Sequence, residues 1–470
     1  MKLYFHGGAG VVTGVNYLLQ TRKAKILVDC GLFQGPRDLE QKNSEPFEYD
    51  PKEIKAVVVS HSHLDHIGRL PQLIKSGFAG KIFATPPTID FTHLILEDSV
   101  KVLEEKAQKA GVVPLFSQVE VEKLMQRFVA VDYYKRTQAA NDIYFTFYEA
   151  GHILGSAVIE LEIEGSSSSH FGEASKKIIF SGDLGNPPAP LLRPPDFLDK
   201  ADYVLVESTY GDRNHEPPEE CKAKIEKIIE DTMSRHGVLL IPSFALERTQ
   251  QLLYHFNDLI EHHRIPAVPV YIDSPLASRI TEIYKKYPQY YNKQTVFEID
   301  SGDDIFNFPG LHFTHSSKES KAINEVPSPK IIIAGSGMSQ GGRIVHHEVR
   351  YLPDSKNTLL LVTYQAEGTL GRKIFDGARK VEILDQNVSV NARIEKMSGY
   401  SAHADQQFLM DWLRNFQKTC YGEDKDVCHA LKKVFVVQGE TPAAKTLMGL
   451  VRDELGVEAE APAIGEVAEL

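Results

Sequence analysis

Four side chains that bind metal ions fall within six positions of this chain. Residues 61 to 66 read His-Ser-His-Leu-Asp-His, directly after an apolar run. Because His61 and His63 are two positions apart on an extended or tightly turned segment, both imidazoles can face one ion. Asp65 and His66 then point elsewhere and can hold a second ion. Such mixed ligands suit zinc or manganese and metal-assisted hydrolysis, whereas the competing interpretation is a solvated, histidine-rich turn.

The composition is that of a globular enzyme. A chain of 470 residues predicts two domains, and 42% hydrophobic with 25% charged residues is ordinary. The sequence has no apolar run of the roughly 18 residues that cross a membrane, and its start lacks the apolar core of a signal peptide. We therefore expect a cytoplasmic protein without a membrane partner. The four cysteines are too scattered for a disulfide framework; Cys420 and Cys428 could pair or bind a metal, but free thiols are the simpler expectation.

The net charge of -12 argues against a protein that binds polyanions through bulk positive charge. It does not exclude a nucleic-acid substrate, because a pair of bound dications would add about four positive charges where phosphate lies. Any basic surface must therefore be local.

Acids and histidines follow several short apolar runs that are typical of buried strands. Active sites of α/β proteins commonly lie in the loops after such strands. Residues 87–111 and 117–128 have helical spacing, and we expect these helices to cover the sheet. The apolar runs cover residues 25–28, 56–59, 178–180 and 203–206, and they precede Asp29, His61, Asp183 and Glu207.

A second alternating α/β pattern follows residue 210. Its expected helices cover residues 219–235 and 247–262, and its expected strands cover 238–242, 268–272 and 331–333. From about residue 372 the chain again carries candidate ligands, with His403 in Ser-Ala-His-Ala-Asp. This histidine can complete the first site only if the middle block is an insertion. The segment 165–170 is expected to be a hairpin tip, and 456–470 a closing strand.

Taken in order, these motifs resemble those of the metallo-β-lactamase superfamily. Glu207 in Glu-Ser-Thr-Tyr-Gly and His403 resemble its β-CASP branch, the nucleases of RNA processing and DNA repair. The nearest likeness is to bacterial and archaeal relatives of the mRNA 3′-end cleavage endonuclease. The resemblance implies an α/β fold, an αββα sandwich made by residues 1–209 and 372–470, with an α/β β-CASP domain inserted at 210–371. The other matching segments are Pro242-Ser243-Phe244-Ala245, Gly335-Ser336-Gly337-Met338 and Glu367-Gly368-Thr369-Leu370.

The resemblance also implies a ligand set for two zinc ions, with manganese as an alternative. Taken singly, His152 could equally be a loop histidine and Asp183 a turn residue, but their order around the hexapeptide favours a metal site. Asp29 would hold the hexapeptide loop through hydrogen bonds. The implied ligands are His61, His63 and His152 for one ion, Asp65, His66 and His403 for the other, and Asp183 as the bridge.

Two ions about 3.5 to 4 Å apart can share a hydroxide that attacks a phosphodiester. In the RNA-cleaving β-CASP enzymes a histidine follows Gly-Thr-Leu by three positions, but here Lys373 stands there, preceded by Arg372. We predict that Lys373 pairs with Glu207 and places positive charge near the leaving group; an ordinary surface lysine is the alternative. The expected catalytic residues are Asp65, Asp183, Glu207, His403 and Lys373.

A second departure is Gln438, in Val-Val-Gln-Gly-Glu, where relatives often carry histidine. Since Gln438 is not among the seven expected metal positions, we expect it to tune activity rather than abolish it.

The resemblance favours RNA as the substrate, because a histidine at the position of His403 goes with RNA in this family. Guanidinium groups suit phosphate, and glycine-rich loops can offer backbone N–H groups. Each arginine could instead form a surface salt bridge. Dimerisation is a further expectation of the family. The candidate phosphate contacts are Arg213, Arg248, Arg343 and Arg372, with the loop residues Gly335, Ser336 and Gly337.

The leading hypothesis is a zinc-dependent ribonuclease that hydrolyses RNA phosphodiester bonds in RNA processing or decay, acting as an endonuclease, a 5′ exonuclease or both. A second hypothesis keeps the metals but gives the enzyme an ester, thioester or lactone substrate, which the inserted domain disfavours. A third is a non-catalytic subunit of an RNA-processing complex, which the filled ligand positions disfavour.

Overall fold

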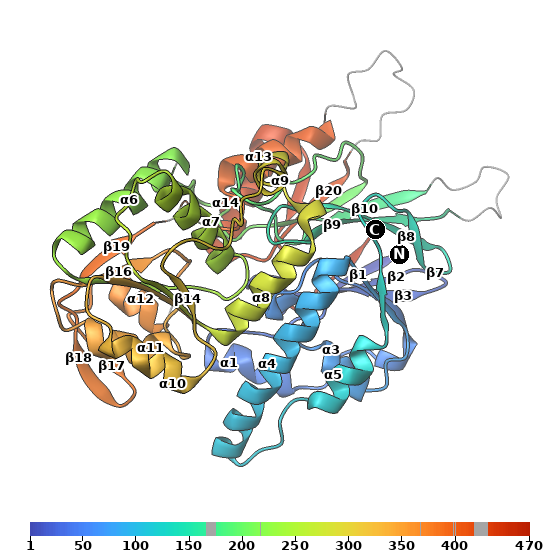
Figure 1. Cartoon of the computed structure of the whole chain (residues 1–470). Helices are drawn as coiled ribbons and strands as arrows, with labels where there is room; N and C mark the ends of the chain where they lie inside the picture. The colour runs from blue at the N-terminus through green and yellow to red at the C-terminus, as the bar shows by residue number, and fades with distance from the viewer. Residues whose placement is uncertain (166–174, 217, 367, 398, 400, 418–430) are drawn as a thin grey trace. The chain divides into compact units, whose positions relative to one another are not determined.

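The computed structural model describes residues 1–165, 175–216, 218–366, 368–397, 399, 401–417 and 431–470 (Figure 1). It divides into two compact units. The expected hairpin tip lies almost wholly outside the described residues, as do Cys420 and Cys428. Unit 1 comprises Met1–Ala189, Pro194–Asn214 and His403–Leu470, and unit 2 comprises Pro190–Arg193 and His215–Ala402.

The first sheet of unit 1 has seven strands in the order β22-β1-β2-β3-β4-β5-β6. Its strands are β1 (Lys2–Gly7), β2 (Asn16–Gln20), β3 (Lys25–Val28), β4 (Ile54–Val58), β5 (Lys81–Ala84), β6 (Phe128–Ala130) and β22 (Val467–Glu469). The helices in this part of the chain are α1 (Arg37–Gln41), α2 (Leu64–Ile67), α3 (Leu70–Lys75), α4 (Pro86–Ala110) and α5 (Gln118–Met125).

The second sheet of unit 1 also has seven strands, in the order β21-β20-β11-β10-β9-β8-β7. Its strands are β7 (Thr137–Ala140), β8 (Ile143–Glu149), β9 (Ala157–Ile163), β10 (Lys176–Phe180), β11 (Tyr203–Glu207), β20 (Lys433–Val437) and β21 (Glu458–Glu460). The accompanying helices are α13 (Gln406–Arg414) and α14 (Thr441–Leu455).

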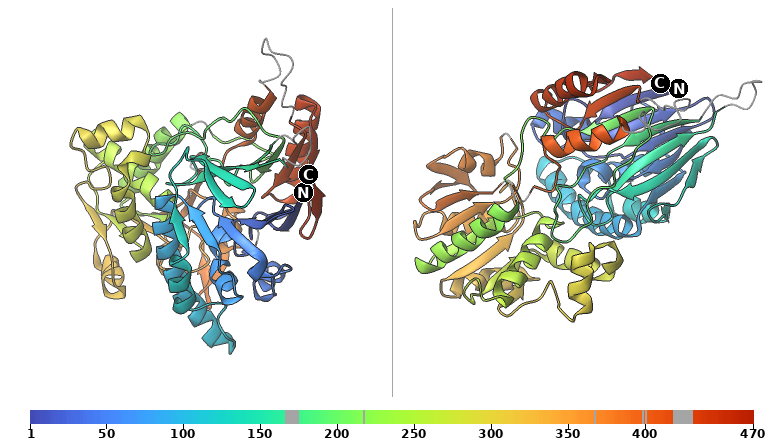
Figure 2. Two further views of the ribbon diagram at one scale, coloured as in Figure 1. Left: turned by 90° about the vertical axis from the view of Figure 1, so that its right-hand side faces the viewer. Right: turned by 90° about the horizontal axis from the view of Figure 1, so that it is seen from above.

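Aromatic side chains join the two sheets of unit 1. The ring centroids of Phe5 and Phe435 are 5.4 Å apart, and those of Phe83 and Phe145 are 5.0 Å apart. The buried Trp412 of α13 belongs to a core cluster between the second sheet and its helices. Helices α3 to α5 lie on the outer side of the first sheet, and α13 and α14 on that of the second (Figures 1 and 2). These layers confirm the expected αββα sandwich.

The C-terminal segment contributes one strand to each sheet of unit 1. We expected a single closing strand, but β22 pairs antiparallel with β1, and β21 pairs parallel with β20. The two chain ends consequently lie side by side (Figure 2), with the Leu470 amide donating to the Met1 carbonyl at 3.0 Å.

Unit 2 is built on a six-stranded sheet in the order β14-β13-β15-β12-β16-β19, in which every pairing is parallel. Strands β12, β15 and β16 are wholly buried, as expected for a parallel sheet covered on both faces. The strands are β12 (Val238–Pro242), β13 (Val270–Asp273), β14 (Leu311–Phe313), β15 (Lys330–Ala334), β16 (Thr358–Leu361), β19 (Arg393–Lys396) and the hairpin pair β17 (Lys380–Ile383) and β18 (Gln386–Ser389).

The helices of unit 2 include those that the sequence predicts over residues 219–235 and 247–262. Of the helices in the described residues, none has both the length and the apolar character needed to cross a membrane. The helices are α6 (Pro218–Ser234), α7 (Arg248–Glu261), α8 (Pro275–Lys286), α9 (Lys293–Asp300), α10 (Ser317–Ala322), α11 (Ile344–Tyr351) and α12 (Leu370–Phe375). Short 3-10 turns occupy Lys42–Ser44, Pro51–Glu53, Pro288–Tyr290 and Ile323–Glu325 across the chain.

The units divide later in the chain than the sequence suggested. Apart from the short segment Pro190–Arg193, which also belongs to unit 2, the chain enters unit 2 at 214/215 instead of 209/210 and returns to unit 1 at 402/403 instead of 371/372. The physical reason for the second difference is strand β19, which pairs with β16 and so keeps the preceding hairpin and the following residues in unit 2.

Candidate metal centre

The polar residues of the candidate centre follow strands of unit 1 at their carboxyl ends. Asp29 follows β3, His61 comes soon after β4, and Asp183 follows β10 within three residues. Because β3 pairs parallel with β4, and β10 with β11, the ends of each pair meet at one edge. Glu207 ends β11, and His152 lies in the connection from β8 to β9.

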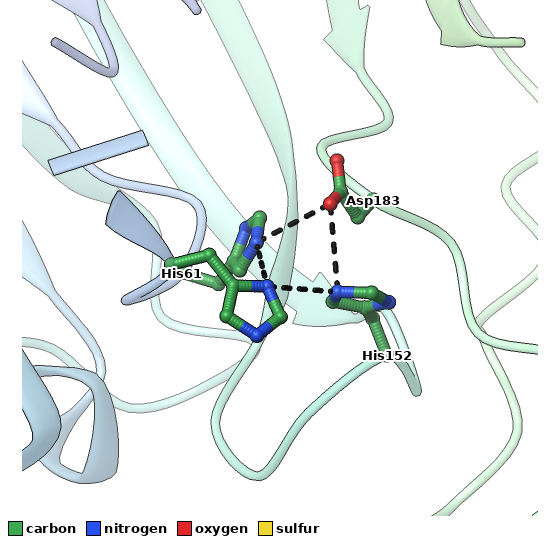
Figure 3. Close-up of side chains that lie close together, drawn as sticks. His61, His152 and Asp183 are labelled. Carbon is green, nitrogen blue, oxygen red and sulfur yellow. Dashed lines mark hydrogen bonds and ion pairs between the residues drawn. The ribbon is translucent and has the colours of Figure 1, made fainter. Parts of the chain in front are cut away.

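Three histidines and an aspartate converge on one point. The Nε2 atoms of His61 and His152 each lie 3.1 Å from Nδ1 of His63 and 3.4 Å from Oδ2 of Asp183. All four ligand atoms lie within 4.8 Å of one another. Figure 3 shows His61 and His152 pointing towards Asp183. We call this set the histidine half-site.

The pKa shifts of His63, His152 and Asp183 suit a cation at the histidine half-site. Burial holds the pKa of His63 and His152 well below the usual range, and neighbouring histidines lower it further. Burial would raise the pKa of Asp183, but His66 and His61 hold it well below the usual range. Neutral imidazoles and an ionised carboxylate are the forms that bind zinc. The donor set therefore fits a divalent metal ion.

Asp29 holds the loop that carries the histidines. Its Oδ1 accepts the backbone N–H of Ser60 at 2.7 Å, and its Oδ2 accepts the Ser60 hydroxyl and Nδ1–H of His66, both at 2.7 Å. With Nδ1 used in this way, Nε2 of His66 faces Oδ1 of Asp183 at 3.3 Å. Burial would lower the pKa of His66, but Asp183 and Asp29 raise it well above the usual range.

His403 lies beside Glu207, whereas the family resemblance implied that it lies with Asp65 and His66. Its Nδ1 is 3.1 Å from Oε2 of Glu207 and 3.9 Å from Oδ2 of Asp183. Glu207 is fully buried and also accepts the Leu184 amide at 2.7 Å. Burial would lower the pKa of His403, but Glu207 raises it to about 9. His403 therefore carries a proton that it donates to Glu207.

Gln438 lies beside His66 and Asp183, where we expected His403. Its Nε2 is 2.6 Å from Oδ1 of Asp183 and 3.1 Å from Nε2 of His66. The sequence carried a signal for this position. Gln438 directly follows the apolar run of β20, just as Asp29 and Asp183 come soon after apolar runs of their own.

Three family models match consecutive parts of the chain. The metallo-beta-lactamase superfamily matches residues 9–231, the Beta-Casp domain matches 249–374, and the Zn-dependent metallo-hydrolase RNA specificity domain matches 387–462. A ribonuclease of Thermus thermophilus is 37% identical over 445 residues, which cover 94% of this chain and 97% of the relative. The chain belongs to the β-CASP branch of the metallo-β-lactamase superfamily.

Further relatives of this β-CASP protein include archaeal transcription termination factors. The transcription termination factor FttA of Methanosarcina mazei is 31% identical over 471 residues, which cover 97% of this chain and 69% of the relative. The FttA of Pyrococcus abyssi is 30% identical with the same coverage. A solved structure of a protein of unknown function from Enterococcus faecalis shares the fold, with a TM-score of 0.57 at 12% identity over 100% of this chain and 99% of that one.

The arginines that we predicted as phosphate contacts of this β-CASP protein have partners within their own units. In unit 1, Arg213 lies 3.1 Å from Asp212 and over the ring of Tyr210. In unit 2, Arg343 lies 2.6 Å from the buried Asp273, Arg372 lies 2.9 Å from Asp376, and the buried Arg248 donates to Gln251.

The glycine-rich loop of unit 2 bonds partly to itself. The Ser336 amide donates to the Gly341 carbonyl at 3.2 Å, and the Gly335 carbonyl accepts the Ile344 amide at 3.0 Å. Gly337 lies against Phe244. Lys373 is exposed on α12 of the same unit. RNA contacts by this loop, by the arginines and by Lys373 stay predictions.

Proposed function

We propose that this chain is a zinc-dependent ribonuclease that hydrolyses phosphodiester bonds of RNA in the cytoplasm. The observation that carries the proposal is the convergence of His61, His63, His152 and Asp183, whose ligand atoms lie within 4.8 Å of one another. The ribonuclease of Thermus thermophilus, which is similar along 94% of the chain, supports RNA as the substrate.

The chain's own residues fix the orientation of the centre. Zinc held by His61, His63, His152 and Asp183 would supply a nucleophile from water near neutral pH and would offset negative charge on the phosphate. Asp183 lies between two sets of candidate ligands. Its Oδ2 faces His61 and His152, while its Oδ1 faces His66. Asp29 fixes the tautomer of His66 by accepting its Nδ1–H.

His403 is the proposed proton donor to the leaving oxygen. The partly exposed imidazole lies 3.1 Å from the fully buried Glu207, which keeps it protonated. A positioned acid of this kind typically contributes about 10² to 10⁴ in rate. Lys373 keeps its predicted role as a source of positive charge near the leaving group, and Arg372 keeps its predicted role as a phosphate contact.

The test compares RNA and DNA of one sequence, each with a 5′-phosphate or a 5′-hydroxyl end. We expect RNA to be cleaved, a chelator to stop cleavage, and added zinc to restore it. The size ladder separates internal cleavage from stepwise removal at the 5′ end. The variant Asp183→Asn should retain the fold and lose cleavage, because the carboxylate of Asp183 contacts both His152 and His66. Intact RNA together with turnover of a thioester would contradict the proposal.

A further inference from the structure

The ligands on the other side of Asp183 form a poorer metal site than the histidine half-site. We call Asp65, His66, Oδ1 of Asp183 and Gln438 the amide half-site. His66 Nε2 lies 3.3 Å from Asp183 but 4.0 Å from Asp65. Within the described residues, no group whose ligand atoms all lie within 4.8 Å of one another combines Asp65 and His66 with Asp183.

The side-chain amide of Gln438 presents its nitrogen to both neighbours. An ionised carboxylate can only accept, so the atom 2.6 Å from Oδ1 of Asp183 is the amide nitrogen. In the neutral imidazole that a metal ion requires, Nδ1 of His66 donates to Asp29, so Nε2 carries the lone pair, and the second N–H of Gln438 faces it at 3.1 Å. An amide nitrogen has no lone pair for a metal ion. The two N–H groups thus cover the lone pairs that a second ion would need.

The backbone holds Gln438 in this place. Its N–H donates to the Gly8 carbonyl at 2.8 Å, and its carbonyl accepts the Thr209 hydroxyl at 3.2 Å. The residue is 3% exposed and has a left-handed φ of 48°. These bonds hold the backbone of Gln438 at the point from which its side chain contacts both Asp183 and His66.

From this geometry we propose that the two half-sites are unequal. The histidine half-site binds one zinc ion tightly, and the amide half-site binds a second ion about 100-fold more weakly. For the second ion to bind, the amide must turn its oxygen inwards and give up both hydrogen bonds. The ligands are then three oxygens and one nitrogen, a set that suits Mn²⁺ better than the histidine-rich set does. The inference rests on the proposed metal centre but not on the identity of its substrate.

The test is the metal content of the whole chain. Metal-free protein is loaded with excess zinc, passed through a desalting column and analysed for zinc. We expect about one ion per wild-type chain, and about two per chain of the Gln438→His variant, because imidazole offers a lone pair where the amide offers N–H. Histidine tolerates left-handed φ, and a cavity of about 10 Å³ lined by Gln438, Asp29 and Ser181 leaves room beside it.

A second measurement keeps the test independent of how well that variant folds. Wild-type protein with one zinc is titrated with Mn²⁺, and free Mn²⁺ is followed by electron paramagnetic resonance. We expect one further, weak site without loss of zinc, and Asp65→Asn should remove the Mn²⁺ site and keep the zinc. Two equally tight zinc ions in the wild-type chain would overturn the inference whether or not RNA is cleaved. Failure to cleave RNA with one retained zinc would instead contradict the proposed function alone.

Discussion

At the scale of single residues, the charge of Glu207 should set the pH dependence of activity through the pKa of His403. The pKa of His403 is raised to about 9, so the proton-donating form is present below that pH and is lost as pH rises through it. Replacing Glu207 by glutamine removes the carboxylate that opposes burial, and the pKa of His403 should fall. We therefore expect the alkaline limb of kcat to move to lower pH in Glu207→Gln, measured on a short labelled RNA between about pH 6 and pH 10.

The matched control is Glu162→Gln, which removes another carboxylate of unit 1 that pairs with Arg136 at 2.8 Å on the surface. It should leave the limb in place. Zinc content should be unchanged in Glu207→Gln if His403 acts as the acid. An unmoved limb together with lost zinc would show that His403 serves the metal instead.

At the scale of elements, the end of β3 packs directly on the metal loop. The Cys30 amide donates to the His66 carbonyl at 2.8 Å, and a Cβ on Gly31 would lie 1.5 Å from the Asp65 carbonyl oxygen. Gly31→Ala must therefore displace the loop. We expect zinc affinity to fall by about 10- to 100-fold, measured by competition with a coloured chelator.

The control for this change is Gly449→Ala in α14, where a Cβ would have no neighbour within 4 Å. Alanine favours a helix by about 1 kcal/mol over glycine, so this variant should be at least as stable as the wild type and bind zinc normally. Equal zinc affinity in the two variants would rule out the packing argument.

At the scale of the whole molecule, the two units should unfold separately. Trp412 is the single tryptophan, is fully buried in unit 1, and donates to the Asp196 carbonyl at 2.9 Å. The residues of the histidine half-site, His61, His63, His152 and Asp183, also belong to unit 1. A ligand present at about 100 times its Kd stabilises the folded state by about 2.7 kcal/mol. A chelator should therefore lower the midpoint of the tryptophan fluorescence transition.

Unit 2 has its own core of buried side chains, so a second transition seen by circular dichroism should keep its midpoint when the chelator is added. Two transitions that move together by the same amount would show that the units unfold as one.

The sequence by itself determined the local parts of the centre. The spacing of His61, His63 and His66 places these candidate ligands in one loop after a buried strand, and this depends only on neighbouring residues. The polar residues after the other apolar runs, Asp29, Asp183 and Glu207, were found in the same way. The αββα class and the inserted α/β domain were implied by the family resemblance that these motifs carry.

Only the tertiary structure decided which distant residue lies beside Glu207 and which lies beside His66 and Asp183. His403 and Gln438 both follow the inserted unit in the chain, and their spacing from the hexapeptide does not distinguish them. The order of strands does so, because β20 lies next to β11 and brings Gln438 to Asp183, whereas His403, ahead of α13, reaches Glu207. The later unit boundary likewise depends on the pairing of β19 with β16. The pairing of β20 with β11 joins segments more than 200 residues apart, and local patterns of side chains do not encode such a pairing.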